Sequence, residues 1–199
     1  MPFILNEDKA LKNLLQGLTV SDAGNSSRPV GVFYGQPDPQ IRQQAYPYIT
    51  IDLIGISEAL ERVHTGYGEL SYTPEGMDPS VPFYTNKPIA VNLDYQIMTY
   101  ARQPRHDRQL AALLFGPNRL PLRFGNLVIP EDNTVRRLDM IGFSKRDTTE
   151  ADKRLFCNVY TVQISSEILR DELVLLNEVL YPPTITFNVS DKGLSVPTE

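Results

Sequence analysis

Hydrophobic and polar side chains alternate along residues 89–98, where every second residue is large and apolar: Ile89, Val91, Leu93, Tyr95 and Ile97. A period of two is typical of a β-strand with one buried face and one more polar face. Behind Pro104, leucines at positions 110, 113 and 114 follow a helical spacing, until Gly116 and Pro117 end the pattern. Residues 88–116 therefore predict a long strand, a short basic corner and an amphipathic helix at the centre of the fold.

Two more stretches, 46–56 and 155–165, have the pattern of strands. Both faces of 46–56 carry apolar side chains, so we expect this strand to be covered on both sides. The segment 118–130 is interrupted by prolines and a glycine, and we expect it to be irregular, with its apolar side chains packed down. Weaker patterns predict helices at 6–18 and 167–177, a helical turn at 57–63, and strands at 29–34, 66–72, 135–143 and 184–189.

These elements predict an α+β fold, with a mixed or antiparallel sheet, helices packed mainly on one face, extended loops and a C-terminal arm. A chain of 199 residues with 41% hydrophobic residues is large enough for one substantial core. We expect a single domain over residues 1–180 and an extended arm over 181–199. The 16 prolines favour extended and turn backbone, hence long ordered loops, which need a surface to lie against. This feature favours an assembly subunit over a lone enzyme.

The net charge is −5, and the chain has no run of lysines and arginines. Sequence-independent binding to nucleic acid depends on many such side chains, so we do not expect it. With Cys157 as the only cysteine, no intrachain disulfide can form, and we expect this thiol to act as a small apolar residue in a strand. The N-terminal segment lacks the pattern of a secretory leader, and no apolar run approaches the ~20 residues of a membrane span. We expect a protein of the cytoplasmic side, or of a particle assembled there.

Few residues offer catalytic chemistry. Asp52 and Asp94 lie on the polar faces of two predicted strands, where they would either meet as paired carboxylates for magnesium or face water or an interface. His106 precedes Asp107, but adjacent residues of a helix point in different directions, so we expect a solvated first turn. Two histidines and one cysteine do not supply a zinc site. We expect no catalytic residue, metal or cofactor; the enzyme alternative is a small metal-dependent hydrolase using Asp52 and Asp94, with His64 or His106 as base.

Three arginines gather at the corner between the central strand and its helix: Arg102, Arg105 and Arg108. Tyr100 precedes them, and arginine and tyrosine are enriched where proteins meet. We expect a subunit or partner interface here. The charged connection 144–153 offers acidic partners from the same or a neighbouring subunit, namely Asp147, Glu150 and Asp152.

Residues 88–121 as a whole resemble the tail terminator (tail completion) proteins of tailed bacteriophages, including the cap proteins of contractile tails. In that family a strand of the form Pro-hydrophobic-x-Leu-x-Tyr-x-(Ile/Leu)-x-x-Tyr runs into a helix with a Leu-Leu-Gly ending. The residues that match are Pro88, Leu93, Tyr95, Ile97, Tyr100, Leu113, Leu114 and, one position late, Gly116. The resemblance extends over about residues 5–168, whereas the insert 65–87 and the tail after residue 169 go beyond the family pattern.

The resemblance implies a structural virion protein without catalytic residues. Six copies would form a ring that caps the tail tube, ends tail growth and joins the head-side neck. The implied partners are further copies of the chain, the tail tube protein, the sheath protein of a contractile tail and the neck connector; DNA would pass through the bore. A ring needs two different patches on each protomer, which we expect near residues 102–108 and on the loops 144–153 and 77–87. Another neck or baseplate component, such as a head–tail adaptor, is the structural alternative.

Overall fold

A computed structural model describes residues 4–22, 24, 26–37, 46–64, 67–69, 84–116, 118–150, 153–168 and 173–174. The chain divides into two compact units, one of Met1–His64 with Pro88–Leu169 and the other of Thr65–Lys87 with Arg170–Glu199. The elements are α1 (Leu5–Leu15), β1 (Thr19–Ser21), β2 (Ser27–Pro29), β3 (Gly31–Tyr34), β4 (Tyr48–Glu58), η1 (Leu60–Arg62), β5 (Tyr67–Glu69), β6 (Tyr84–Asn86), β7 (Ile89–Ala101), α3 (Pro104–Leu114), β8 (Gly125–Ile129), β9 (Thr134–Lys145), β10 (Thr148–Glu150), β11 (Lys153–Ile168) and β12 (Leu173–Val174).

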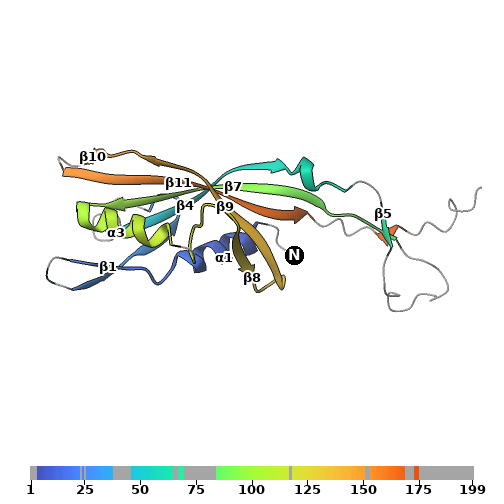
Figure 1. Cartoon of the computed structure of the whole chain (residues 1–199), viewed down its shortest axis with the longest axis horizontal. Coiled ribbons are helices and arrows are strands. Elements are labelled where there is room, and N and C mark those ends of the chain that lie inside the picture. The colour runs from blue at the N-terminus through green and yellow to red at the C-terminus, as the bar shows by residue number, and fades with distance from the viewer. Residues whose placement is uncertain are drawn as a thin grey trace, which may run out of the picture. The chain divides into compact units, whose positions relative to one another are not determined.

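The first unit contains a seven-stranded sheet in the order β3-β4-β7-β11-β9-β8, with β10 paired to β11 (Figure 1). β3 and β4 are parallel, whereas the other pairs are antiparallel, so the sheet is mixed. β1 and β2 form a separate antiparallel pair. The second unit contains an antiparallel sheet in the order β12-β6-β5. Strands dominate, and the described residues include two α-helices, as expected for an α+β protein.

The stretch 88–116 folds as the sequence predicts. β7 lies between β4 and β11 and pairs with β11 along its whole length, from Ile89 opposite Ile168 to Ala101 opposite Phe156. α3 begins at Pro104, whose fixed φ suits the first helical turn. Leu110 and Leu114, four residues apart, are buried on one side of this helix, whereas Leu113 is exposed, contrary to the predicted stripe.

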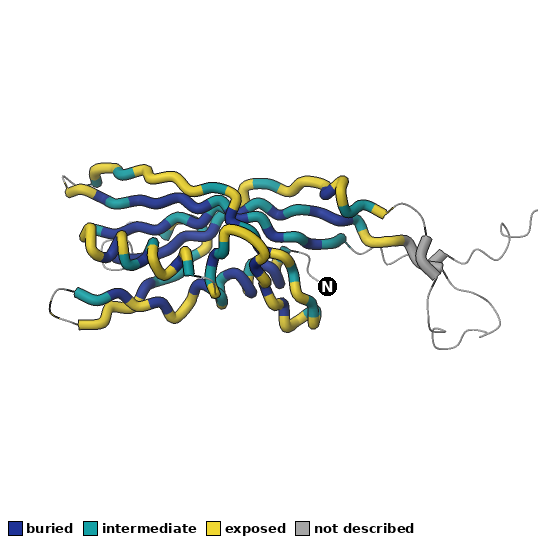
Figure 2. Tube along the Cα trace, viewed as in Figure 1, coloured by how far each residue is buried: buried dark blue, intermediate teal, exposed yellow. Residues whose placement is uncertain are grey.

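The main core lies on the face of the sheet that carries Leu93, Tyr95 and Ile97 of β7. Side chains from α1, α3, β8, β9 and β11 belong to the same cluster, including Leu11, Leu15, Leu110, Leu114, Leu127, Leu138 and Tyr160. A second cluster on the opposite face contains Tyr46, Tyr48, Tyr100, Leu155, Cys157 and Val159. Figure 2 shows the result, with β7 and β11 buried over much of their length and the helices buried on one side.

The first half of β4 is buried on both faces, as predicted, because the two clusters cover it there. Its second half is exposed on both, so the expectation of a strand covered along 46–56 is wrong beyond Asp52. The strand also continues to Glu58, and the predicted helical turn is reduced to η1.

Two predicted elements are wrong in kind. The segment 118–130 contains β8, in which burial alternates because Leu127 and Ile129 point to the core while Val128 is exposed. The expectation that apolar side chains pack down is confirmed for Leu120, Leu127 and Ile129, but Leu122 and Phe124 stay exposed. Of the expected helix 167–177, residues 167–168 continue β11 and residues 173–174 form β12, because strand partners are available there; the rest lies outside the described residues.

The other differences concern boundaries. α1 ends at Leu15, and the expected last turn is replaced by a bend before β1, although Leu18 is buried. The expected arm from residue 181 and the strand 184–189 lie outside the described residues, as do residues 77–83 of the expected loop 77–87, whose residues 84–86 form β6. Among the described residues, no helix is long and apolar enough to cross a membrane.

Candidate functional site

The predicted interface residue Tyr100 lies in a cluster of aromatic rings near the end of β7. β4 begins where β7 ends, so Tyr48 lies directly opposite Tyr100, and the two rings stack with centroids 4.8 Å apart. Tyr46 packs against Tyr48 at 5.2 Å, and Phe33 of β3 meets Tyr48 edge-on at 6.1 Å. Aromatic pairs in these geometries add to the free energy of simple burial.

Arg102 contacts both this aromatic cluster and the β10–β11 hairpin. Its guanidinium lies 4.7 Å from the centre of the Tyr46 ring and donates to Oε2 of Glu150 at 2.9 Å. It also donates to the backbone carbonyls of Glu150 and Lys153. The hydroxyl of Tyr46 donates to the same Glu150 oxygen at 2.6 Å. Burial raises the pKa of Tyr46, and the bond to Glu150 and its charge raise it further.

The other predicted charges behave differently. Asp147 accepts hydrogen bonds from Arg154 at 2.9 Å and from the backbone N–H of Cys157 at 3.4 Å. Arg105 and Arg108 are exposed on α3, and within the described residues no hydrogen bond or ion pair reaches either side chain. Asp152 lies outside the described residues. The corner therefore combines one arginine bound within the chain with two whose side chains make no polar contact among the described residues.

A cleft of about 380 Å³ opens beside the aromatic cluster. The cleft is lined by Gln36 and by apolar and polar side chains of β4, β7, β10 and β11. They include Tyr48, Met98, Tyr100, Glu150 and Cys157. Nε2 of Gln36 donates to the hydroxyl of Tyr100 at 3.2 Å. Burial raises the pKa of Tyr100 and of the Cys157 thiol. Because both groups stay protonated at neutral pH, the arrangement suits contact and hydrogen bonding rather than nucleophilic attack.

The state of Cys157 gives a first prediction. We expect the folded protein to react slowly with a disulfide reagent such as DTNB, because the thiol is buried and its pKa is raised. The same protein in guanidinium should react at the rate of a free thiol. Absorbance after mixing measures both rates; equal rates would contradict the buried, protonated thiol.

The acidic residue Asp147 gives a pH prediction. Partial desolvation raises its pKa, but the bond from Arg154, the Cys157 N–H and the charge of Lys145 outweigh it, so the pKa lies below the ordinary 3.8. A carboxyl with a lowered folded pKa stabilises the fold above its unfolded pKa and loses this effect as the pH falls through the folded value. We expect Asp147→Asn to lower the unfolding midpoint at pH 7 and to lower it progressively less below pH 3.8. Thermal unfolding of both proteins across this range is the measurement; a constant difference would be the contrary result.

His106 and Asp107 are not a solvated first turn, and that expectation is wrong. Only 3% of His106 and 4% of Asp107 are exposed. As predicted for helix neighbours, the two side chains point to different partners. Nε2 of His106 lies 2.6 Å from Oδ1 of Asp22, whereas Asp107 accepts bonds from Lys145 and Asn158, each at 2.6 Å. These contacts connect α3 to β9, to β11 and to the end of β1.

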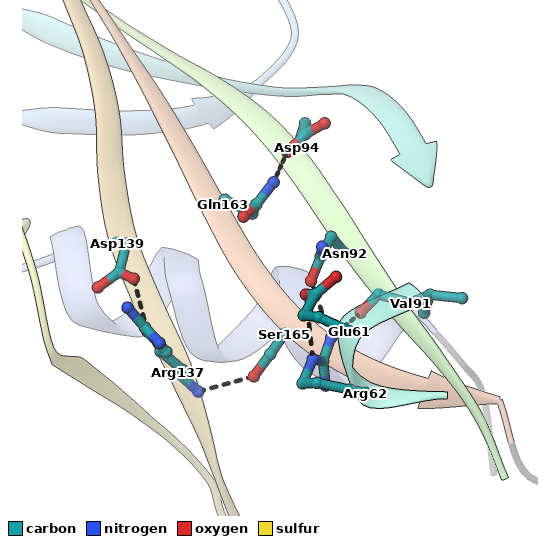
Figure 3. Close-up of polar contacts among 9 residues, drawn as sticks. All are labelled: Glu61, Arg62, Val91, Asn92, Asp94, Arg137, Asp139, Gln163 and Ser165. Carbon is teal, nitrogen blue, oxygen red and sulfur yellow. Dashed lines mark hydrogen bonds and ion pairs between the residues drawn. The ribbon is translucent and has the colours of Figure 1, made fainter. Parts of the chain in front are cut away.

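Asp52 and Asp94 lie on neighbouring strands but are not paired. In the register of β4 and β7, Asp52 is opposite Gln96, and Asp94 is opposite Gly55. Asp94 instead accepts a 3.0 Å bond from Gln163 of β11, one of several polar contacts across this face in Figure 3. In the part of the chain that the structure describes, no three His, Cys, Asp or Glu side chains gather in a way that could hold a metal ion. His64 lies at the end of the segment after η1 and is exposed.

The aromatic partners of Tyr100 were not among the residues predicted from the sequence. A signal was present, because Tyr46 and Tyr48 share one face of the predicted strand 46–56. The pattern did not contain the register that brings Tyr48 opposite Tyr100, nor the contact of Tyr46 with Tyr48. No family model matches this chain, and no curated protein was found to be similar to it in sequence.

Proposed function

We propose that this chain is a structural subunit of a bacteriophage tail, six copies of which form a ring that caps the tail tube and joins it to the neck. The observation that carries the proposal is the stretch 88–116. It holds the residues of the tail terminator resemblance, and it folds as β7 and α3 with β7 between two long strands. The residues of the resemblance are packing residues, and Leu93, Tyr95 and Ile97 among them lie in the main core, which supports a shared fold.

The proposal includes an arrangement of layers, in which α1 and α3 cover the same face of the sheet. Leu15 of α1 and Leu114 of α3 belong to one cluster with Leu93 of β7, which supports it. The opposite face then carries the aromatic cluster at one end and polar strand residues further along, and it is open to partners.

The proposed partners are other copies of the chain, the tail tube protein, the sheath protein where the tail is contractile, and the neck connector. The protein would be assembled in the host cytoplasm and lie at the head-proximal end of the tail. Arg105 and Arg108 would contact acidic groups of the tube or neck protein, because both are exposed and unengaged within the described chain. The acidic balance of −5 suits a bore through which DNA passes without specific binding. Neither a cofactor nor an enzymatic activity is part of the proposal.

Electron microscopy of a phage whose copy of this gene is deleted tests the proposal. Headless tails of uncontrolled length are the expected result, and complementation with the wild-type gene should restore finished tails. Tails of normal length that lack heads would instead make the protein a neck adaptor. Intact virions would overturn the structural function, and assays of Asp94→Asn for lost hydrolysis would then be the next step.

The proposed contact of Arg105 and Arg108 with the tube or neck protein can be tested by complementation of the same deletion. We expect Arg105→Glu with Arg108→Glu to fold but to fail in complementation, because two repulsive charges would face the partner. Asn13→Glu, which adds a negative charge at an exposed position of α1, is the control and should complement. Full complementation by the double variant would remove these arginines from the interface.

A further inference from the structure

The second half of β4 is an open edge of the sheet. β3 pairs with β4 only from Tyr48 to Ile51. Beyond that point β4 continues to Glu58 with β7 on one side and, among the described residues, no strand on the other. At such an edge the backbone N–H and C=O groups of alternate residues are left for another chain.

The side chains of this edge are apolar and acidic. We define the β4 edge as Leu53, Ile54, Ile56, Glu58, Leu60 and Glu61. Ile54 is 54% exposed and Leu60 77% exposed, and Leu53 and Ile56 are also exposed. Natural proteins usually protect an open edge with lysine, proline or a very short strand, but residues 52–58 contain neither lysine nor proline. Within the described residues no ion pair reaches Glu58, and Glu61 has only a 3.9 Å contact with Arg62.

An apolar and basic surface lies at the other end of the strand order. We define the β8–β9 face as Leu122, Arg123, Phe124, Val128, Val135 and Arg137. Val128 and Val135 are direct cross-strand neighbours, and both are exposed. Phe124 is 78% exposed, and the guanidinium of Arg137 lies 5.3 Å from the centre of its ring. Arg123 is exposed, and Arg137 keeps most of its side chain exposed while it pairs with Asp139.

The strands between these two surfaces satisfy their polar groups among themselves. Figure 3 shows Arg62 bound to Asn92, Gln163 bound to Asp94, and the backbone N–H of Arg137 bound to Ser165. These polar side chains have partners, whereas the exposed apolar groups named above belong to β4, β8, β9 and the residues beside them. Within one copy β7 and β11 separate the two surfaces, so they cannot meet.

We propose that the β4 edge of one copy binds the β8–β9 face of the next copy. The two surfaces are both apolar and carry opposite charges, with Glu58 and Glu61 on one and Arg123 and Arg137 on the other. Because they are different surfaces of the same chain, the contact is head-to-tail, and such contacts close into rings or extend into filaments. The inference rests on the self-assembly in the proposed function and names the surfaces that join. It leaves Arg105 and Arg108 for the tube or neck protein.

Charge exchange tests this pairing with purified full-length protein. Variant A carries Glu58→Lys and Glu61→Lys; variant B carries Arg123→Glu and Arg137→Glu. Each variant alone would place like charges at every contact, and we expect each to self-associate at least ~10-fold more weakly than wild type. In an equal mixture, the lysines of A face the glutamates of B, and the wild-type glutamates of B face the wild-type arginines of A. The mixture should therefore recover the wild-type oligomer, with A and B alternating.

Light scattering after gel filtration measures the mass of each sample, and negative-stain images show whether rings form. The control is Asn13→Glu with Gln16→Glu, which adds two negative charges at exposed positions in and just after α1 and should keep the oligomer. Thermal unfolding shows that A and B are folded. Oligomers that persist in A and B, or a mixture that does not recover, would overturn this inference while leaving the deletion phenotype of the proposed function intact. A wild-type chain that stays monomeric at the highest concentration reached would also overturn it.

Discussion

Replacing Ile97 with alanine is expected to destabilise the first unit by about 2–5 kcal/mol, the range for large-to-small changes in a packed core. Ile97 is fully buried at the middle of β7, in the cluster that also holds Leu93 and Leu110. The lost side chain removes apolar contacts and leaves a cavity that the surrounding strands can refill only in part, because β7 is held by neighbours on both sides.

Urea unfolding followed by circular dichroism, at one fixed protein concentration, measures this loss. Ile141→Ala on β9 is the matched control because Ile141 is exposed, and we expect it to cost less than about 1 kcal/mol. A similar small loss for Ile97→Ala would mean that β7 does not lie at the centre of the core.

The second large effect is expected from Asp107→Ala. Asp107 is buried, and its two oxygens accept bonds from Lys145 and from the buried amide of Asn158. Removing one member of a buried, hydrogen-bonded charge pair leaves buried polar groups such as the Asn158 amide without a partner, which costs about 3–5 kcal/mol when burial is complete. Because nearly half of the Lys145 side chain is exposed and can turn to water, we expect the lower end of this range.

One further variant separates the charge from the hydrogen bonds, and a second is a surface control. Asp107→Asn keeps an acceptor for Asn158 and should lose less stability than Asp107→Ala. Glu131→Ala removes a surface pair with Lys9 and should cost much less, because surface ion pairs contribute little to the free energy of unfolding. The same unfolding measurement applies. Equal losses for Asp107→Ala and Glu131→Ala would contradict the structural importance of the buried carboxylate.

The aromatic cluster shows that sequence periodicity predicts strands but does not predict how they pair. Alternation placed Tyr48 on a strand, because the two-residue period is a local property of extended backbone, and the strand motif of the resemblance extends the next strand to Tyr100. That these rings stack depends on the register of β4 against β7 and on the start of one strand beside the end of the other. Register joins residues about fifty positions apart, and no local period contains it.

The same distinction applies to the candidate site. The arginine corner could be located from sequence, since Arg102, Arg105 and Arg108 are close together in the chain. Their different states could not be predicted, because Arg102 is engaged by Glu150, 48 residues away, whereas Arg105 and Arg108 are not engaged within the described chain. The burial of Asp107 likewise depends on Lys145 and Asn158, 38 and 51 residues further along.

The sequence by itself determined the central strand, the helix behind Pro104 and the mixed α+β class, because periodicity and helix breakers act over a few neighbouring residues. The tertiary structure alone decided that 125–129 is a strand, that residues 167–168 extend β11 rather than begin a helix, and that the end of β4 is an open edge. In each case the outcome depends on whether another strand lies alongside to complete the backbone hydrogen bonds, and that partner comes from a distant part of the chain.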